Sequence, residues 1–356
     1  MRIDIIRPAE LDAALRARWH AIRHTSAQRH LRSPFFAPEF AELIGQVRPM
    51  ARIAVIEVDR EVAGFFAFER SALGNAGPLG ARMSDGHGPV LDARFSIDPG
   101  RLVRACGLLG WRFDHLPADQ PGFGRFESTR SRAWLIRLDH GFEAYRREID
   151  QRTSWMRRNQ AKMRRLEREF GPLRFEARTL DAMPFEQLAR WKSDQYVRTG
   201  QVDNFAIAWI RDYLDRLRQV ESPALTGMMS TLHAGDRLIA VHLGMRSERV
   251  WHHYLPSYDR ELSSHSPGLC LLHRMAETAP ELGLNTIDFS SGDMDYKLAV
   301  SNEQVELAQG SVEPAPMRAL RRSAQATVER MRRVPWVLQA ARWSRRRVID
   351  QVNAMR

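Results

Sequence analysis

The sequence predicts an α/β protein made of two tandem units, each with a mixed, largely antiparallel sheet flanked by helices, and a basic helical tail. The length of 356 residues suits two units of about 150 residues and a remainder. A strand-turn-strand pattern occurs twice, about Asp59-Arg60 and about Gly235-Asp236, and each copy precedes a helix-like segment and another strand. We therefore predict units at 1–147 and 148–312 and a tail at 313–356.

The first unit contains a hairpin between residues 53 and 68. Its two runs are rich in β-branched and aromatic residues and flank the polar pair Asp59-Arg60, a pattern that predicts antiparallel strands. Residues 101–109 have helical periodicity, and residues 111–114 form a short strand-like run after them. The predicted order is strand, strand, helix, strand.

The second unit repeats this order and adds a strand and a long opening helix. Residues 155–168 carry many basic side chains and contain no proline or glycine before Gly171, which predicts one continuous helix. Three strand-like runs follow, at 230–233, 238–244 and 250–255. A helix near 269–282 and a strand at 286–289 complete the unit.

The positive charge is concentrated in the tail. Residues 315–356 contain eleven arginines and two acidic residues, which account for +9 of the net charge of +11. Trp336, Ala340 and Trp343 recur at helical spacing beside arginines, so we predict binding to an anionic membrane surface, with a solvated basic tail as the alternative. Because the rest of the chain is nearly neutral and matches no nucleic-acid-binding module, we expect no nucleic-acid partner.

The cysteines, the histidines and the first residues of the chain indicate the expected cellular compartment and the absence of a metal site. Cys106 and Cys270 are isolated in apolar runs, and adjacent His252 and His253 would face opposite sides of a strand, so we expect no metal site. The charged start and the lack of 18 successive apolar residues argue against a signal peptide and a membrane span. We expect a cytoplasmic protein, with a peripheral place at the inner leaflet if the tail binds lipid.

The start of the helix near residue 269 is the clearest candidate binding element. Ser266 suits an N-cap, Pro267 suits the first helical position, and Gly268 would let a ligand approach the backbone. Unpaired N–H groups at such a helix start bind phosphate, although Ser-Pro-Gly is also a common capping signal without a ligand.

Several motifs of the second half resemble a known superfamily. Three antiparallel strands, the loop Tyr258–Gly268, a helix, and then Asp288-Phe289-Ser290, Gly292-Asp293 and Tyr296-Lys297 resemble GNAT acyltransferases, and more narrowly the BioF-like/CelD-like acetyltransferases of polysaccharide biosynthesis. The resemblance implies two tandem GNAT-like domains and an acyl-CoA co-substrate. It implies CoA contacts from Ser263, Ser264, His265, Ser266, Gly268 and Leu269.

The first half resembles this family more loosely. It shows Ser33-Pro34-Phe35-Phe36, the hairpin and the polar loop 84–88, but no Ser-Pro-Gly helix start. The resemblance therefore implies a degenerate copy that shapes an acceptor cleft.

Acyl transfer to an amine or hydroxyl needs a proton acceptor and a group that stabilises the oxyanion. His242 is one candidate base, although it suits a buried structural histidine equally well, and Asp288 is its rival. Lys297 is the candidate for charge stabilisation. Further candidates for acceptor contacts are Trp155, Asn159, Tyr196, Asp293 and Tyr296.

The expected function is transfer of an acyl group, with acetyl-CoA as the expected donor, to a polar acceptor in exopolysaccharide or envelope glycan synthesis. Tyr296-Lys297 also resembles the aromatic-lysine pair of Fem-type aminoacyl transferases, but Leu298-Ala299-Val300 departs from that pattern. A non-catalytic scaffold at the membrane is the third reading, and a lack of acyl-CoA binding would favour it.

Overall fold

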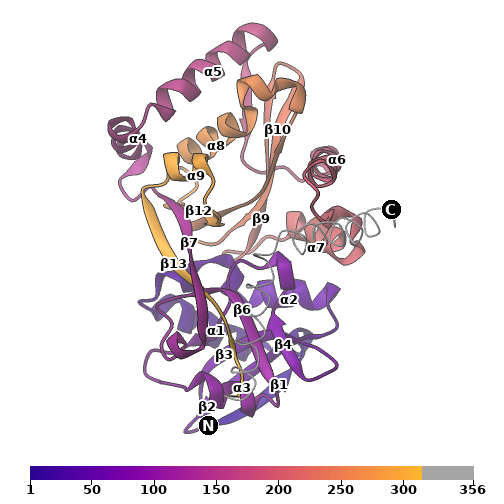
Figure 1. Cartoon of the computed structure of the whole chain (residues 1–356), viewed down its shortest axis with the longest axis vertical. Coiled ribbons are helices and arrows are strands. Elements are labelled where there is room, and N and C mark those ends of the chain that lie inside the picture. The colour runs from indigo at the N-terminus through magenta and orange to yellow at the C-terminus, as the bar shows by residue number, and fades with distance from the viewer. Residues whose placement is uncertain (315–356) are drawn as a thin grey trace, which may run out of the picture.

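The computed structural model describes residues 1–314 and contains one continuous mixed sheet that runs through two lobes (Figure 1). The strand order along the sheet is β1-β2-β3-β4-β6-β13-β7-β12-β11-β10-β9-β8, with β5 beside β3. The strands are β1 Arg2–Ile6, β2 Ala51–Val58, β3 Glu61–Arg70, β4 Asn75–Pro78, β5 Val90–Leu91, β6 Gly110–Pro117, β7 Glu127–Arg137, β8 Leu173–Glu176, β9 Thr226–Ala234, β10 Arg237–Arg246, β11 Val250–Tyr258, β12 Thr286–Ser291 and β13 Glu303–Val312.

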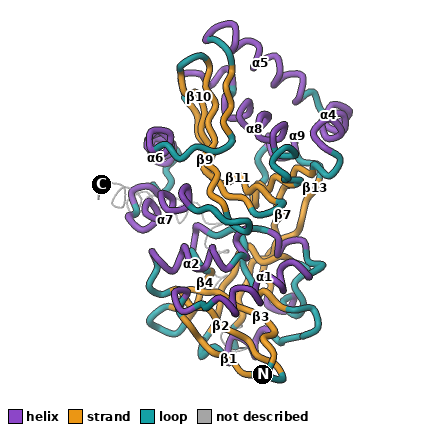
Figure 2. The backbone as a smooth tube through the Cα atoms, turned by 180° about the vertical axis from the view of Figure 1, so that it is seen from behind, coloured by secondary structure: helices purple, strands orange, loops and turns teal. Residues whose placement is uncertain are grey.

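The helices cover both faces of the sheet. They are α1 Ala13–Thr25, α2 Pro38–Val47, α3 Pro99–Ala105, α4 Gly141–Arg152, α5 Trp155–Phe170, α6 Ala182–Arg198, α7 Ala208–Gln219, α8 Pro267–Thr278 and α9 Asp295–Val300. Figure 2 shows α5 and α8 on one side of β9–β11 and α6 and α7 on the other. The core under α6 and α7 continues into the first lobe through α1 and α2, so the two lobes share packed apolar side chains.

Both predicted hairpins are confirmed. Strands β2 and β3 meet at Asp59 and Arg60, whose φ angles of 51° and 68° suit the tight turn that joins twisted antiparallel strands. Strands β9, β10 and β11 are consecutive antiparallel neighbours. The predicted basic helix is α5, which buries Met156, Met163 and Leu166 and turns its arginines to solvent.

The two halves repeat the same local topology. In the first half, β4 pairs parallel with β6 across the crossover that contains α3, and in the second, β11 pairs parallel with β12 across α8. Such a parallel pair at the edge of an antiparallel meander supports the prediction of a duplicated α/β unit.

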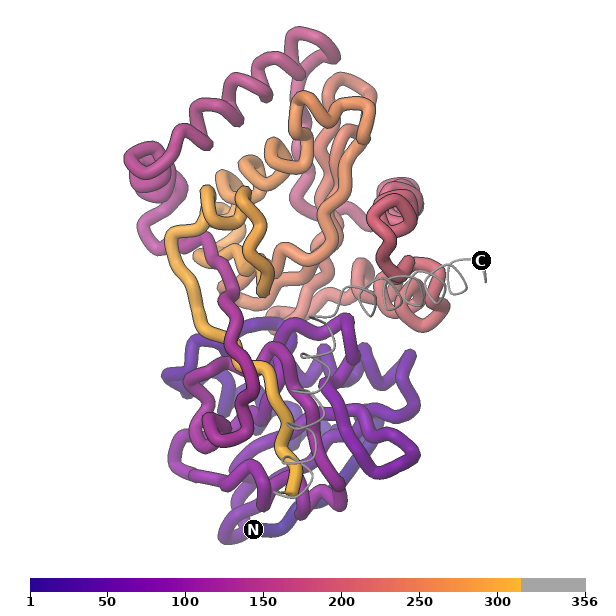
Figure 3. Tube along the Cα trace, viewed as in Figure 1, coloured from indigo at the N-terminus to yellow at the C-terminus, as the bar shows by residue number. Residues whose placement is uncertain are grey.

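The last strand of each half pairs with the other half. Strand β7 pairs with β12 of the second half, β13 pairs with β6 of the first, and β7 and β13 pair with each other (Figure 3). The domain boundary that we predicted between residues 147 and 148 lies inside α4 and stays a prediction. The sequence did not indicate this exchange of strands.

The predicted tail begins directly after β13. Its helices and its membrane binding concern residues 315–356, which lie outside the described part of the chain. Within residues 1–314, we find no helix with the length and apolar character that a membrane crossing requires.

Candidate active site

Strands β11 and β12 form a fork at the centre of the second half. They pair only from Val250 to His252, opposite Thr286 to Asp288. Beyond His252 the β11 backbone has no strand on that side among the described residues. The fork arises because β12 bends: Ser290 has a φ of 56°, and its N–H donates to Asp288 Oδ1 at 2.7 Å.

Lys297 holds this bend in place. Its Nζ donates to the carbonyl oxygens of Phe289 at 2.8 Å and Ser291 at 2.7 Å. The side chain is buried, and burial is the main reason that its pKa lies below the usual lysine value, although nearby carboxylates oppose the shift. An ammonium group has three N–H donors, so one remains available to a ligand at the fork.

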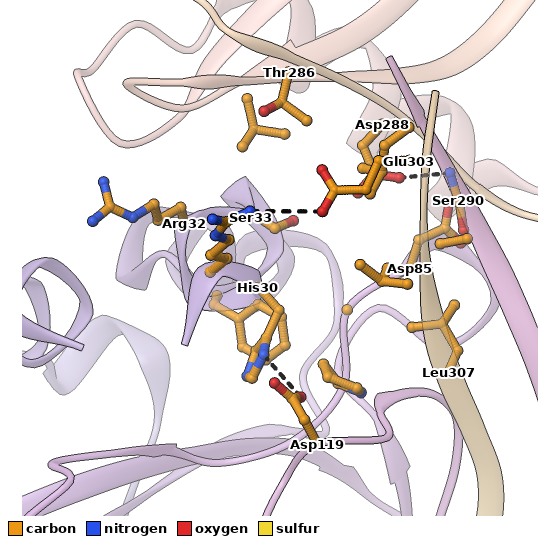
Figure 4. A pocket seen from close by; sticks show the side chains of 18 of the residues that line it. His30, Arg32, Ser33, Asp85, Asp119, Thr286, Asp288, Ser290, Glu303 and Leu307 are labelled. Carbon is orange, nitrogen blue, oxygen red and sulfur yellow. Dashed lines mark hydrogen bonds and ion pairs between the residues drawn. The ribbon is translucent and has the colours of Figure 1, made fainter. Parts of the chain in front are cut away.

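A cavity of about 840 Å³ lies beside the fork and takes its walls from both halves (Figure 4). The first half contributes residues 26–36, the loop at Asp85-Gly86, the end of β6 and part of β7, and the second contributes β12, part of β13 and the start of β11. The volume is within the range of sites for small molecules. We refer to this cavity as the inter-lobe pocket.

Two carboxylates that line the inter-lobe pocket flank His252, which is buried behind them. His252 Nε2 lies 3.0 Å from Asp85 Oδ2, and its Nδ1 lies 3.9 Å from Asp288 Oδ2, which is too long for a hydrogen bond. Burial disfavours the imidazolium, but the carboxylates of Asp288 and Asp85 outweigh burial and raise the pKa of His252 to about 9. Burial also opposes charge on Asp85, but the contact with His252 lowers the pKa of that carboxyl to about 2.

A second histidine near the pocket, His115, comes from the first half and reaches across to β12. His115 Nε2 lies 2.9 Å from Ser291 Oγ, and its Nδ1 lies 2.9 Å from Asp114 Oδ1. Burial lowers the pKa of His115, but the hydrogen bond with Asp114 outweighs it, so the net shift is upward. Asp85, His115 and His252 were not predicted as site residues, and the only sequence signal was the polar loop 84–88.

His87, Asp114 and His115 have potential metal-ligand atoms within 4.8 Å of one another, but they do not form a convincing metal site. His87 Nδ1 accepts the backbone N–H groups of Asp114 and His115, and its Nε2 lies 3.0 Å from the carbonyl oxygen of Ser84. Both ring nitrogens are therefore engaged, and burial lowers the pKa of His87 to about 4.

The two predicted candidate bases lie in different surroundings. Asp288 lines the inter-lobe pocket. His242 is fully buried on β10 and outside the pocket lining, and its Nε2 accepts the N–H of Tyr254 at 3.1 Å while its ring stacks on His253. Burial holds the pKa of His242 well below its ordinary value. The structure thus brings Asp288 and Lys297 to the fork and gives His242 the surroundings of a core residue.

The predicted CoA loop forms the 3-10 helix η7, Arg260–His265, directly before α8. Ser266 is the N-cap residue as predicted, but its left-handed backbone, with φ of 51°, differs from the extended N-cap, and its side chain caps no N–H. Its Oγ accepts a hydrogen bond from Lys162 Nζ at 2.7 Å instead. Leu269 and Cys270 donate to the Ser266 carbonyl, which leaves Gly268 N–H without a described acceptor at the helix start.

The remaining loop residues differ in exposure. Ser263 and Ser264 are exposed, whereas His265 is buried with its Nε2 at 2.9 Å from Glu169 Oε2.

Comparisons with known proteins relate this chain to a protein family and to solved structures. Residues 153–298 match the model of the acetyltransferase (GNAT) domain. This segment is therefore similar to a GNAT domain. A search of curated protein sequences returned no match.

Solved structures extend the likeness to both halves of the chain. FemX superposes with a TM-score of 0.59 at 12% identity, over 90% of this chain and 99% of FemX. A Bacteroides thetaiotaomicron protein of unknown function superposes with a TM-score of 0.51 at 10% identity, over 83% of this chain and 97% of that protein. At such identities the likeness shows the fold alone, which this chain shares with FemX over both halves.

The helix start in the GNAT domain has a counterpart in the first half that differs in charge. There, Asp98-Pro99-Gly100 opens α3, and the Asp98 side chain accepts the N–H of Arg101 at 2.8 Å. A carboxylate at this position would repel a phosphate and already uses one N–H donor. The contrast favours the GNAT domain as the site of an anionic co-substrate.

The five predicted acceptor contacts do not line the inter-lobe pocket. Asn159 Nδ2 donates to Leu269 O at 3.1 Å between α5 and α8, and Trp155 stacks on His273 nearby. The others contact local partners: Tyr196 is close to Asn204, Asp293 accepts from Trp134 Nε1, and Tyr296 packs on Phe289. Their roles toward an acceptor stay predictions.

Proposed function

We propose that this GNAT-fold acyltransferase moves an acyl group from acyl-CoA to an amino or hydroxyl group of a polar acceptor held in the inter-lobe pocket. The observation that carries the proposal is the fork between β11 and β12, which opens beside that pocket. An open strand edge supplies backbone hydrogen bonds to an extended ligand, and the fork leaves space between two strands that would otherwise pair.

The donor would lie along β11 with its pyrophosphate at the start of α8. Gly268 N–H, the helix dipole and the Lys162 ammonium beside Ser266 all favour a negative charge there. This arrangement supports the predicted CoA contacts at residues 263–269.

Asp288 is the proposed base, because it lines the pocket and lies at the last pair before the fork. The acceptor nitrogen or oxygen attacks the thioester carbonyl carbon and passes its proton to Asp288. The C–S bond then breaks, and CoA leaves as a thiolate that takes up a proton. The remaining N–H of Lys297 would stabilise the oxyanion, while His252, held charged by Asp85, lies 3.9 Å from the Asp288 carboxylate.

The finer assignments come from the sequence: its family resemblance suggests the donor and the acceptor, and the charge of its tail suggests the membrane. We propose acetyl-CoA as the donor and an envelope or exopolysaccharide glycan as the acceptor, at the cytoplasmic side of a membrane that the basic tail contacts. His242 is the alternative base, and the pH-rate profiles of Asp288→Asn and His242→Gln distinguish the two. The variant that removes the acidic limb of the profile identifies the base.

The test of the proposal is CoA binding by calorimetry to the full chain and to Gly268→Val. A β-carbon at Gly268 would lie 3.2 Å from the Tyr258 ring, and a valine would also cover the free N–H. We expect at least tenfold weaker binding, about 1.4 kcal/mol. Gly77→Val is the matched control, because no atom lies within 4 Å of the added β-carbon.

Equal affinity in folded Gly268→Val would remove the proposed CoA site. If the unaltered chain binds no acyl-CoA, the acyl-CoA mechanism fails. Transfer from charged tRNA would then favour the Fem-like alternative, and inactivity with both donors would favour the scaffold.

A further inference from the structure

We propose that an exposed tip of the first lobe inserts two leucines into an anionic membrane surface. The tip consists of the loops at residues 71–74 and 106–109, which lead from β3 to β4 and from α3 to β6, and we refer to it as the leucine tip. The proposal goes beyond the proposed function, which assigned membrane contact to the basic tail alone. It involves neither the CoA site nor the inter-lobe pocket.

The leucine tip brings together two unusually exposed apolar side chains. Among residues 1–314, the three most exposed large apolar side chains are those of Leu73 at 80%, Met183 at 77% and Leu109 at 64%. Met183 lies on α6, whereas the two leucines are neighbours: Leu109 N–H donates to Gly74 O at 2.9 Å, and a β-carbon at Gly74 would lie 3.4 Å from Leu109 Cγ. Single exposed apolar residues are ordinary, but two at one tip form a patch that suits an apolar partner.

Hydrogen bonds hold both loops of the leucine tip in place. Ser71 N–H donates to Asn75 O at 2.7 Å, and Ser71 O accepts the N–H of Gly74 at 3.1 Å. The other loop begins with the two hydrogen bonds of a Schellman motif, which run from the N–H groups of Gly107 and Leu108 back to carbonyls of α3. Both leucines therefore face solvent from closed turns, and their transfer into a membrane costs little backbone entropy.

Cations surround the leucine tip. Arg70 ends β3 and donates from Nη2 to Gly107 O at 3.3 Å, and Arg52 lies near the start of the neighbouring strand β2. Neither arginine makes an ion pair with another described residue, and Glu69, the acidic neighbour of Arg70, lies 2.6 Å from Arg48. These positive charges would attract anionic headgroups. They would also repel the arginine-rich tail, which argues against the tail as the cover of this patch.

The described chain ends beside the leucine tip. Val312 of β13 pairs with Trp111 of β6, and a β-carbon at Gly110 would lie 3.3 Å from Glu313 Cβ. Figure 3 shows that β13 ends in the first lobe, far from the second lobe. Residues 315–356, with their net charge of +9, follow from this point. Stable attachment of a protein to a membrane takes two signals, and the leucine tip would supply the second one beside the basic tail.

A lipid surface suits the leucine tip better than a protein partner does. A specific protein interface covers about 800 Å² on each side, to which two leucines contribute only a small part. A lipid surface needs no matching shape, and it favours apolar side chains that are flanked by cations.

The experiment measures co-sedimentation of the full chain with vesicles of phosphatidylcholine and phosphatidylglycerol in equal parts. We expect the double variant Leu73→Ser, Leu109→Ser to bind at least about tenfold more weakly, because the leucine side chains no longer enter the acyl region. Met183→Ser is the matched control, since Met183 is as exposed as the leucines but lies on α6. It should bind the vesicles as the unaltered chain does.

A fluorescent label reports whether the leucine tip itself enters the lipid. The native Cys106 and Cys270 are buried, so a polarity-sensitive label on the folded Leu109→Cys variant attaches at position 109. Its emission should shift to shorter wavelength when vesicles are added. The same label on Met183→Cys should show no shift.

Absence of vesicle binding, equal binding by the double variant, or unchanged emission at position 109 would overturn the proposal. A dimer that the double variant loses would also overturn it, because a second copy would then cover the leucine tip. A lower melting temperature of the double variant without vesicles would do the same, because a segment of the chain would then cover it.

CoA affinity is measured on the same samples. Normal CoA affinity with no effect of the leucines on vesicle binding rejects only this inference. Failure of the unaltered chain to bind CoA rejects the proposed function and leaves the role of the leucine tip standing.

Discussion

The pair formed by Asp85 and His252 should make the stability of the protein depend on pH between about 6.5 and 9. The pKa of His252 is raised to about 9 in the folded chain, from about 6.5 in an unfolded one. A raised pKa gives stability that is fully present below pH 6.5 and is lost as the pH rises through 9. At about 1.4 kcal/mol for each pH unit, the contribution is about 3 kcal/mol.

Asp85→Asn tests this reasoning, because the neutral amide no longer favours the charged imidazole. Asp288 would then be the one carboxylate beside His252 that still opposes burial, so the pKa of His252 should rise less and the dependence of stability on pH should become smaller. Urea unfolding at pH 6.5 and pH 9.5 measures the effect. The unaltered chain should lose about 3 kcal/mol over this interval, and Asp85→Asn should lose less.

Glu248→Gln is the control for this measurement. Glu248 lies 3.0 Å from His24 in an exposed pair, so its removal should leave the pH dependence unchanged. The reasoning is refuted if the unaltered chain and Asp85→Asn lose the same stability. It is also refuted if NMR shows that His252 titrates near its ordinary pKa.

Three other predictions follow from single contacts. Lys297→Met should lower turnover about 100-fold with little change in CoA affinity, because the oxyanion loses its cation; a loss confined to CoA affinity would make Lys297 a co-substrate contact. Gly227→Ala should destabilise the chain by about 3 kcal/mol or more in urea unfolding, because the added β-carbon would lie 1.8 Å from Leu217 O; an unchanged midpoint would contradict this packing. Lys162→Ala should weaken CoA binding about tenfold at low salt and less at high salt, and a salt-independent loss would argue against a charge effect.

Local sequence patterns predicted several elements of the fold. The hairpin at Asp59-Arg60 and the helix start at Pro267 are specified by residues that are close in the chain. The strands β7 and β13 were not predicted, and alternation of side chains would identify a strand but not its partner, so the pairing of β13 with both β6 and β7 could not be predicted.

The composition of the site was harder to predict than the fold. Asp288 and Lys297 belong to motifs within one segment, whereas Asp85 and His252 are separated by 167 residues and meet only because two lobes pack together. A histidine on a strand has the same sequence signature in a core as at a pocket wall. His242 and His252 show this, because both are buried on strands and only His252 lies beside Asp85, a residue that lines the pocket.

The position of β13 has a consequence for the order of assembly during synthesis. It is the one strand in the described sheet that connects β6 to β7, so before it forms the sheet consists of two separate pieces with exposed edges. Residues 303–312 leave the ribosome after every other described strand. Until then, the edge of β6 in the first lobe has no partner strand. Open edges invite pairing with other chains, so a chain that stops before residue 303 would present two of them to its neighbours.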